Sequence, residues 1–205
     1  MLELFVSSLV TFFVVIDPIG CAPIFAGLTA GASAAHRRAQ AVRAVGIGTG
    51  ILLIFALFGE ALLNGMGISL AAFRIAGGIM LFLIALEMVF ERRTQRREDR
   101  AAKVAERHEE DVSVFPMAMP MIAGPGSIAS VMLLGARHSG LEAHLVILAA
   151  MAAILLATLL ALLAAGPIMR ALGTRVEAVI TRLLGVLLAA LAVQFVADGL
   201  AVVLR

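Results

Sequence analysis

The chain has 205 residues, of which 62% are hydrophobic, and it carries a net charge of only +2. A soluble domain is closer to half apolar, so the composition excludes an ordinary globular protein. The charges lie in short separate segments, which argues against a nucleic-acid partner, and a single cysteine, Cys21, excludes an intramolecular disulfide.

Residues 112–136 and 145–169 contain no charged side chain. Because a Lys or Arg at the bilayer centre costs about 2.5–3.5 kcal/mol, these runs predict a polytopic membrane protein.

Six apolar segments are predicted to cross the lipid bilayer, which makes the expected fold class an all-α polytopic membrane protein. Their predicted ranges are residues 4–30, 39–60, 68–89, 112–135, 145–169 and 176–204. The lipid bilayer is therefore the first expected partner of this chain.

The first predicted span contains the sequence I-D-P-I-G-C-A-P, in which Asp17 is the only charge between Leu4 and Ala35. Pro18 has no amide hydrogen and its ring clashes with the carbonyl four residues earlier, so the helix is predicted to break there. Asp as N-cap and Pro at the first helical position also begin a helix well. The new half-helix would expose backbone N–H groups near Gly20 and Cys21, which suit a carboxylate or another small anion.

Glycines in the second and third predicted spans are interpreted as sites of close helix packing rather than of function. They are Gly46, Gly48, Gly50, Gly77 and Gly78.

Residues 91–111 form a polar segment with seven basic and seven acidic side chains, and they divide the chain nearly in half. The charges alternate with helical spacing, which favours a short solvated helix or a disordered linker over a specific binding role. Thirteen of the 16 Lys and Arg residues, Arg182 included, fall in or next to the first, third and fifth connections between spans. The positive-inside rule therefore places these connections in the cytoplasm and both termini outside.

The fourth predicted span is expected to break at Gly124-Pro125, as the first does at Asp17-Pro18. Free N–H groups are then expected near Gly126 and Ser127. A single proline kink would be structural, but two breaks at matching places, one with a buried acid, favour a substrate site. The candidate substrate-binding residues are Asp17, Pro18, Gly20, Cys21, Gly124, Pro125, Gly126 and Ser127. Asp17 is a candidate to bind a substrate ammonium, a coupling cation or a proton.

The two halves of the chain show weak self-similarity at a nearly constant offset. The matched pairs are Arg74 and Arg182, Gly77 and Gly185, Gly65 and Gly173, and Pro18 and Pro125. We therefore expect two three-span repeats, residues 1–90 and 112–205, on either side of the charged segment 91–111. Three spans per repeat is an odd number, so the second copy is inverted in the membrane, as in many secondary transporters.

Enzyme chemistry finds little support in the sequence. All four histidines lie in predicted loops, and no second membrane aspartate is placed to pair with Asp17. Phosphate-binding, dinucleotide-binding and metal-ligand motifs are also missing. We therefore expect neither an enzyme nor a bound cofactor or metal.

Three motifs resemble the MarC family of six-span bacterial and archaeal membrane proteins. They are F-F-V-V-I-D-P-I-G-C-A-P-I-F at residues 12–25, F-R-I-A-G-G-I-M-L-F-L-I-A-L at 73–86 and P-M-A-M-P-M-I-A-G-P-G-S-I at 116–128. The resemblance implies an inverted-repeat protein of the bacterial inner membrane, related to LysE-type exporters. In that membrane the charge pattern described above places both termini in the periplasm. It also implies transport of small neutral amino acids such as glycine and alanine. The family commonly has Asn where this chain has Cys21. If that amide contacts the substrate in relatives, this chain lacks one hydrogen-bond donor and one acceptor beside Asp17.

The expected function is secondary transport of a small neutral amino acid by alternating access. The alternatives are export of bulkier apolar or drug-like compounds, and a membrane scaffold that transports nothing. Coupling to Na⁺ or H⁺, the direction of transport and homo-oligomer formation are left open.

Overall fold

The computed structural model describes residues 1–92, 95–99, 111–138 and 140–204, with the backbone alone for 167–178. Within these residues the chain forms helices and no β-strand. The helices are α1 (Leu2–Ile16), α2 (Pro18–Leu28), α3 (Ala34–Gly65), α4 (Leu70–Val89), η1 (Ser113–Ile122), α6 (Pro125–Arg137), α7 (Leu141–Leu163) and α8 (Ala165–Val203).

The length and composition of these helices are those of an integral membrane protein. Five segments of the described chain are long and apolar enough to cross a membrane, and the joined pair α1 and α2 counts as one of them. A sixth span results if η1 and α6, which meet at an angle of 47°, are taken together. Large apolar side chains also point outward, among them Leu57 and Phe58 of α3 and Leu156 of α7, as expected for surfaces in contact with lipid.

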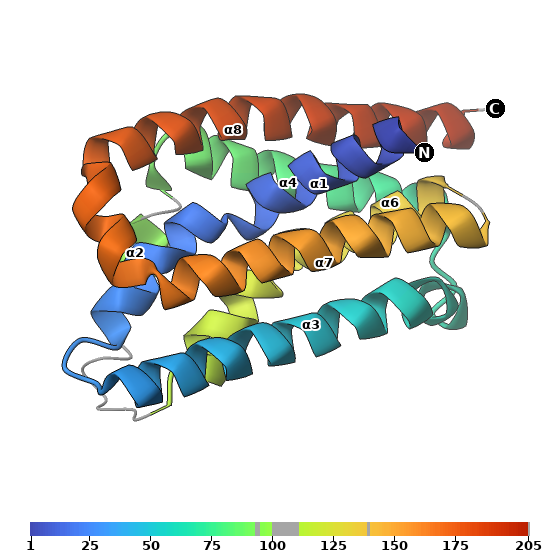
Figure 1. The fold of residues 1–205 in the computed structure, drawn as a ribbon. Helices are drawn as coiled ribbons and strands as arrows, with labels where there is room; N and C mark the ends of the chain where they lie inside the picture. The colour runs from blue at the N-terminus through green and yellow to red at the C-terminus, as the bar shows by residue number, and fades with distance from the viewer. Residues whose placement is uncertain (93–94, 100–110, 139, 205) are drawn as a thin grey trace.

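The helices run side by side along one direction, and both termini lie at the same end of the bundle (Figure 1). The α3–α4 and α6–α7 connections lie at that end as well. The α2–α3 connection, the start of η1 and the α7–α8 junction lie at the opposite end. The described parts of the connections predicted to be cytoplasmic therefore lie at one end of the molecule.

The first predicted span is interrupted at a single residue. Asp17 has a left-handed backbone conformation (φ +59°, ψ +69°) and separates the last residue of α1, Ile16, from the first residue of α2, Pro18. Asp and Asn adopt this conformation more readily than other non-glycine residues, so the residue type suits its position.

The fifth span is shorter than predicted. We expected residues 145–169, but α7 ends at Leu163 and α8 begins at Ala165. The reason lies in Pro167, which offers no amide hydrogen to the carbonyl of Leu163 and would clash with it in a continuous helix. The first turns of α8 then run steeply to the rest of that helix (Figure 1), and its membrane-crossing part is Val179–Val203.

Helices α4 and α8 form the most extensive pairing in the bundle, and glycines lie where they meet. A Cβ atom added at Gly78 would lie 2.8 Å from the carbonyl oxygen of Ala192, and one at Gly199 would lie 2.9 Å from that of Ala71. Lipid supplies no hydrophobic force between helices, so small residues that allow backbone contact stabilise such pairs. The packing interpretation is therefore confirmed for Gly78, and also for Gly48 and Gly77, where an added Cβ would lie 2.7 Å from Ile122 and 2.9 Å from Leu133. At Gly46 and Gly50 an added Cβ would meet no described atom within 4 Å.

The start of η1 is held by Asp111. This carboxylate accepts a hydrogen bond from the Ser113 amide at 2.9 Å and forms an ion pair with Arg43 of α3. The hydrogen bonds from Ser113 and the Arg43 charge keep the pKa of Asp111 below its usual value. Asp111 is thereby fixed next to α3.

Candidate functional site

Asp17 caps the helix that follows it. Its Oδ1 accepts a hydrogen bond from the amide of Gly20 at 3.0 Å, and its backbone carbonyl accepts one from the amide of Cys21 at 3.0 Å. The residue is only 5% exposed. The N–H groups expected to bind an anion near Gly20 and Cys21 are therefore engaged by Asp17 itself in this conformation.

Glycine at position 20 makes this cap possible. A Cβ atom there would lie 2.3 Å from Oδ2 of Asp17, well inside the van der Waals distance. The D-P-x-G order thus combines a capping carboxylate, a helix-starting proline and the space that the carboxylate requires.

Substitution of Gly20 by alanine is expected to displace the Asp17 carboxylate and to destabilise the protein. Loss of an N-cap costs about 0.5–2 kcal/mol, so thermal unfolding of the purified protein should begin at a lower temperature. Gly27→Ala is the matched control, because it lies in the same helix and has no described atom within 4 Å of an added Cβ. Equal unfolding temperatures for the two variants would contradict this role of Gly20.

A second buried charge meets Asp17 from a distant part of the sequence. The Nη1 atom of Arg97 lies 2.9 Å from Oδ2 of Asp17, and the two side chains are 9% and 6% exposed. The prediction that segment 91–111 is entirely solvated is therefore wrong for Arg97. A buried carboxylate is stabilised by a nearby positive charge. The position of Asp17 within an apolar span was therefore the only sequence feature that pointed to a basic partner.

The second break differs from the first because no side chain caps it. Gly124 precedes α6 with an extended backbone (φ −78°, ψ 170°), and Pro125 is the first helical residue. Within the described chain, no side chain accepts a hydrogen bond from the N-terminal amides of α6. Gly126 allows this first turn to approach α4 and α1, since an added Cβ would lie 2.7 Å from Ile84 and 3.0 Å from Val15.

Ser127 is buried in this first turn without a hydrogen-bond partner. It is 1% exposed, and its Oγ contacts no donor or acceptor in the described part of the chain. Several threonine hydroxyls in the spans donate to a carbonyl four residues earlier, as Thr11 does at 2.8 Å and Thr158 at 2.8 Å. Ser127 therefore departs from the usual behaviour of hydroxyls in membrane helices.

A cavity of about 420 Å³ opens onto the α6 N-terminus. This volume falls in the range of about 300–1,000 Å³ that is typical of small-molecule sites. The lining residues are Val15, Met80, Leu83, Ile84, Glu87, Arg96, Arg97, Pro120, Met121, Gly124, Pro125, Gly126 and Ser127. We call this space the central cavity.

Charges of both signs face the central cavity. Glu87 and Arg96 line it and form an ion pair at 2.6 Å, and Arg97 lines it while paired with Asp17. Among the described residues, no group of three or more His, Cys, Asp or Glu side chains is arranged to hold a metal ion. The paired charges of the lining suit a small polar molecule.

The eight predicted site residues divide into two groups. Gly124, Pro125, Gly126 and Ser127 line the central cavity. Asp17 does not line the cavity itself but forms an ion pair with Arg97, which does. Pro18, Gly20 and Cys21 form the capped start of α2. The Cys21 thiol is buried and lies 3.5 Å from the Ile16 carbonyl oxygen, so it contacts the backbone of the preceding helix. Glu87, Arg96 and Arg97 are lining residues that sequence reasoning missed.

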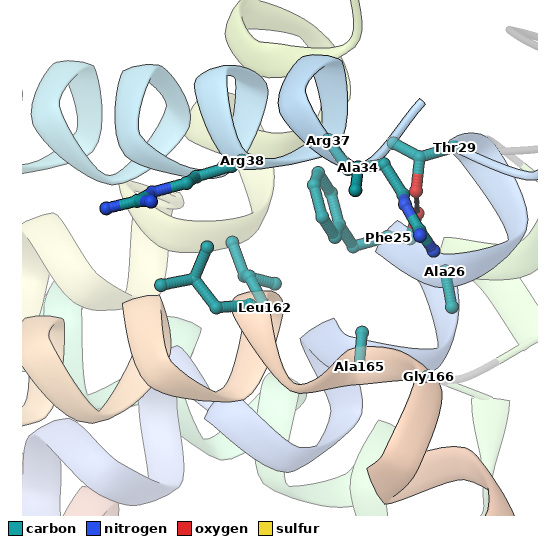
Figure 2. A pocket seen from close by; sticks show the side chains of 10 residues that line it. Phe25, Ala26, Thr29, Ala34, Arg37, Arg38, Leu162, Ala165 and Gly166 are labelled. Atoms are coloured by element: carbon teal, nitrogen blue, oxygen red, sulfur yellow. Dashed lines mark hydrogen bonds between the residues drawn. The ribbon is translucent and has the colours of Figure 1, made fainter. Parts of the chain in front are cut away.

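A second cavity of about 320 Å³ lies between α2, the start of α3 and the α7–α8 junction. Figure 2 shows its two arginines, Arg37 and Arg38, with guanidinium groups that point away from each other. The hydroxyl of Thr29, which also lines it, donates to the Phe25 carbonyl at 2.7 Å. The groups do not converge on a common point, so this cavity is a weaker candidate site than the central cavity.

Comparison with known proteins agrees with this architecture. UPF0056 membrane protein YvbG of Bacillus subtilis is 37% identical over 201 residues, which cover 98% of this chain and 95% of that protein. UPF0056 membrane protein MJ1677 of Methanocaldococcus jannaschii is 36% identical and covers 97% of both chains. UPF0056 membrane protein YhcE of Escherichia coli is 31% identical over 92% of this chain and 87% of its own.

The names of these relatives describe membrane proteins and mention neither a substrate nor a catalytic activity. No solved structure matches the chain significantly. The family model of the MarC family integral membrane protein matches residues 2–204. This chain therefore belongs to the MarC family of integral membrane proteins.

Proposed function

We propose that this protein is a secondary transporter of small neutral amino acids, of the glycine and alanine class. The observation that carries the proposal is the central cavity, a space of about 420 Å³ inside an apolar helical protein that is lined by charges of both signs. Irregular backbone at membrane depth is tolerated where it lines a cavity, and Gly124 to Ser127 do so. A zwitterion has the matching chemistry, because it carries one positive and one negative group.

The charge balance of the lining favours a substrate without net charge. Arg97 is paired with Asp17 and Arg96 with Glu87, so the four groups sum to zero. A neutral zwitterion enters such a site without leaving an uncompensated buried charge, which would be costly. In the proposed site its ammonium meets Glu87 or Asp17, and the candidate residues at both helix breaks shape the space.

Two inverted repeats, residues 1–90 and 112–205, are part of the proposal. The helix pairings support it. Helices α1 and α2 pack on α7 as η1 and α6 pack on α3, and α2 contacts α8 as α6 contacts α4. Exchange of the two halves leaves this pattern unchanged, as expected of a two-fold axis in the membrane plane. Rocking of one repeat against the other would give alternating access to the central cavity.

The proposed orientation places both termini in the periplasm and segment 91–111 in the cytoplasm of a bacterial cell. The gathering of the basic connections at one end of the bundle supports it. Arg96 and Arg97 would then approach the central cavity from the cytoplasmic side.

Flux through proteoliposomes tests the proposed function. Purified protein is expected to give saturable uptake of radiolabelled glycine and L-alanine above the level of protein-free liposomes. A hydrophobic cation such as tetraphenylphosphonium should show no saturable flux, because it has no carboxylate to offset the charges of Arg96 and Arg97 in the lining. Na⁺ and pH gradients applied separately identify the coupling ion. Saturable flux of the hydrophobic cation alone would favour an exporter of apolar compounds, and no flux of any solute would favour a scaffold.

A further inference from the structure

We infer that the carboxylate of the substrate binds at the first turn of α6, where Gly126 and Ser127 line the central cavity together with Arg97. The proposed donors are the Ser127 hydroxyl, the Gly126 and Ser127 amides and the Arg97 guanidinium. This inference rests on the proposed function and deepens it, since it names the substrate-recognising groups. It also assigns Arg97, a residue of the charged segment between the two halves, to the binding site. The recognised chemistry is a small monocarboxylate group.

The N-termini of α2 and α6 differ in whether a carboxylate of the protein occupies them, and this difference points to α6 as the anion site. The carboxylate of Asp17 occupies the N-terminus of α2 through its contact with Gly20. At α6, a helix of 13 residues, the described chain supplies no such carboxylate, and the first turn faces the central cavity. A helix N-terminus carries unpaired N–H donors and a partial positive charge, so an external carboxylate has the same chemistry there as Asp17 has at α2.

The unpaired hydroxyl of Ser127 is the second observation that points to a ligand. Buried polar groups in native proteins nearly always have a partner, and an exception calls for an explanation. Ser8 and Ser130 also carry buried hydroxyls without a partner among the described residues, but neither lines the central cavity. Of the three, only Ser127 lines the central cavity, so a molecule bound there could supply its missing hydrogen bond.

Arg97 adds a full positive charge to the lining of the cavity. A guanidinium has five N–H donors in a planar fork, and the ion pair with Asp17 is made by Nη1. Asp17 holds the guanidinium at the cavity wall and compensates its charge while the site is empty. A substrate carboxylate then forms charge-assisted hydrogen bonds to a group that is already in place.

Binding measurements on the purified full-length protein test this inference. The probes are L-alanine, propionate (which keeps the carboxylate but has no ammonium) and L-alaninol (which keeps the ammonium but has no carboxylate). Arg97→Gln and Ser127→Ala are each expected to weaken binding of L-alanine and propionate at least about ten-fold, the effect of losing a hydrogen bond to a charged group. Binding of L-alaninol should not change. Arg97→Lys should restore part of the affinity, because it keeps the charge but loses the fork.

Two matched controls separate recognition from folding. Arg92→Gln removes one positive charge from an exposed position of the same segment. Ser130→Ala removes a buried and equally unpartnered hydroxyl from the same helix, away from the central cavity. Both variants should bind L-alanine as the unmodified protein does. If Arg97→Gln does not fold, Ser127→Ala and its control still decide the question.

Each outcome separates this inference from the proposed function. Undiminished binding of L-alanine by Arg97→Gln and Ser127→Ala would overturn the anion site and leave amino-acid transport standing. The anion site would also be overturned if the unmodified protein bound neither L-alanine nor propionate. The flux measurement would then test amino-acid transport independently. Arg97-dependent binding of propionate by a protein that transports no amino acid would support the anion site and contradict the proposed function.

Discussion

Asp17→Asn is expected to abolish saturable amino-acid uptake and to destabilise the protein, although it preserves the shape of the helix break. Asn caps helices about as well as Asp and tolerates the left-handed conformation of residue 17, so the variant removes the charge alone. The Arg97 cation is then left buried without a carboxylate. Breaking a buried ion pair costs about 3–5 kcal/mol when the remaining charge stays in place, and less where it withdraws into water.

The double variant Asp17→Asn, Arg97→Gln provides the control. It removes both charges, so it should be more stable than Asp17→Asn alone, as judged by thermal unfolding of the purified protein. Its uptake should remain low, because the charge assigned to substrate recognition is also gone. Strictly additive effects of the two single substitutions on stability would show that the two side chains are not coupled. Unchanged uptake in Asp17→Asn would remove Asp17 from the transport mechanism.

Gly78→Ala is expected to disrupt the pairing of α4 with α8 and to cause a large loss of stability from a single added methyl group. The new Cβ would lie 2.8 Å from the Ala192 carbonyl oxygen and 3.0 Å from the Val196 amide nitrogen. These are backbone atoms, so relief requires the two helices to separate. Overpacking of this kind costs about 1–3 kcal/mol. Thermal unfolding followed by circular dichroism measures the loss.

Gly50→Ala is the matched control for Gly78→Ala. Gly50 also lies within a span, in α3, but an added Cβ there meets no described atom within 4 Å. Alanine favours a helix over glycine by about 0.8–1.0 kcal/mol, so this variant should unfold at the same or a higher temperature. A stability loss in Gly50→Ala as large as that in Gly78→Ala would contradict the packing explanation.

Much of the architecture follows from short-range chemistry that is visible in the sequence. Uncharged runs predict spans because lipid excludes charge, and the described helices meet this expectation. Asp17 and Pro18 act on their immediate neighbours, and α1 ends and α2 begins at these positions. The end of the fifth span was predicted six residues too late, since the uncharged run continues past Leu163 while Pro167 already acts on the backbone.

The composition of the central cavity could not be predicted in the same way. Arg97 is one of seven basic residues in segment 91–111, and nothing in its neighbours distinguishes it from the other six. Its contact with Asp17 joins residues 80 positions apart, and the burial of Ser127 without a described hydrogen-bond partner is a property of the folded bundle. Local patterns report where a helix starts and which segments prefer lipid. The packing of distant helices decides which charged side chain is buried and which buried hydroxyl has no partner within the protein. Burial and pairing are properties of the assembled fold, so local sequence patterns do not report them.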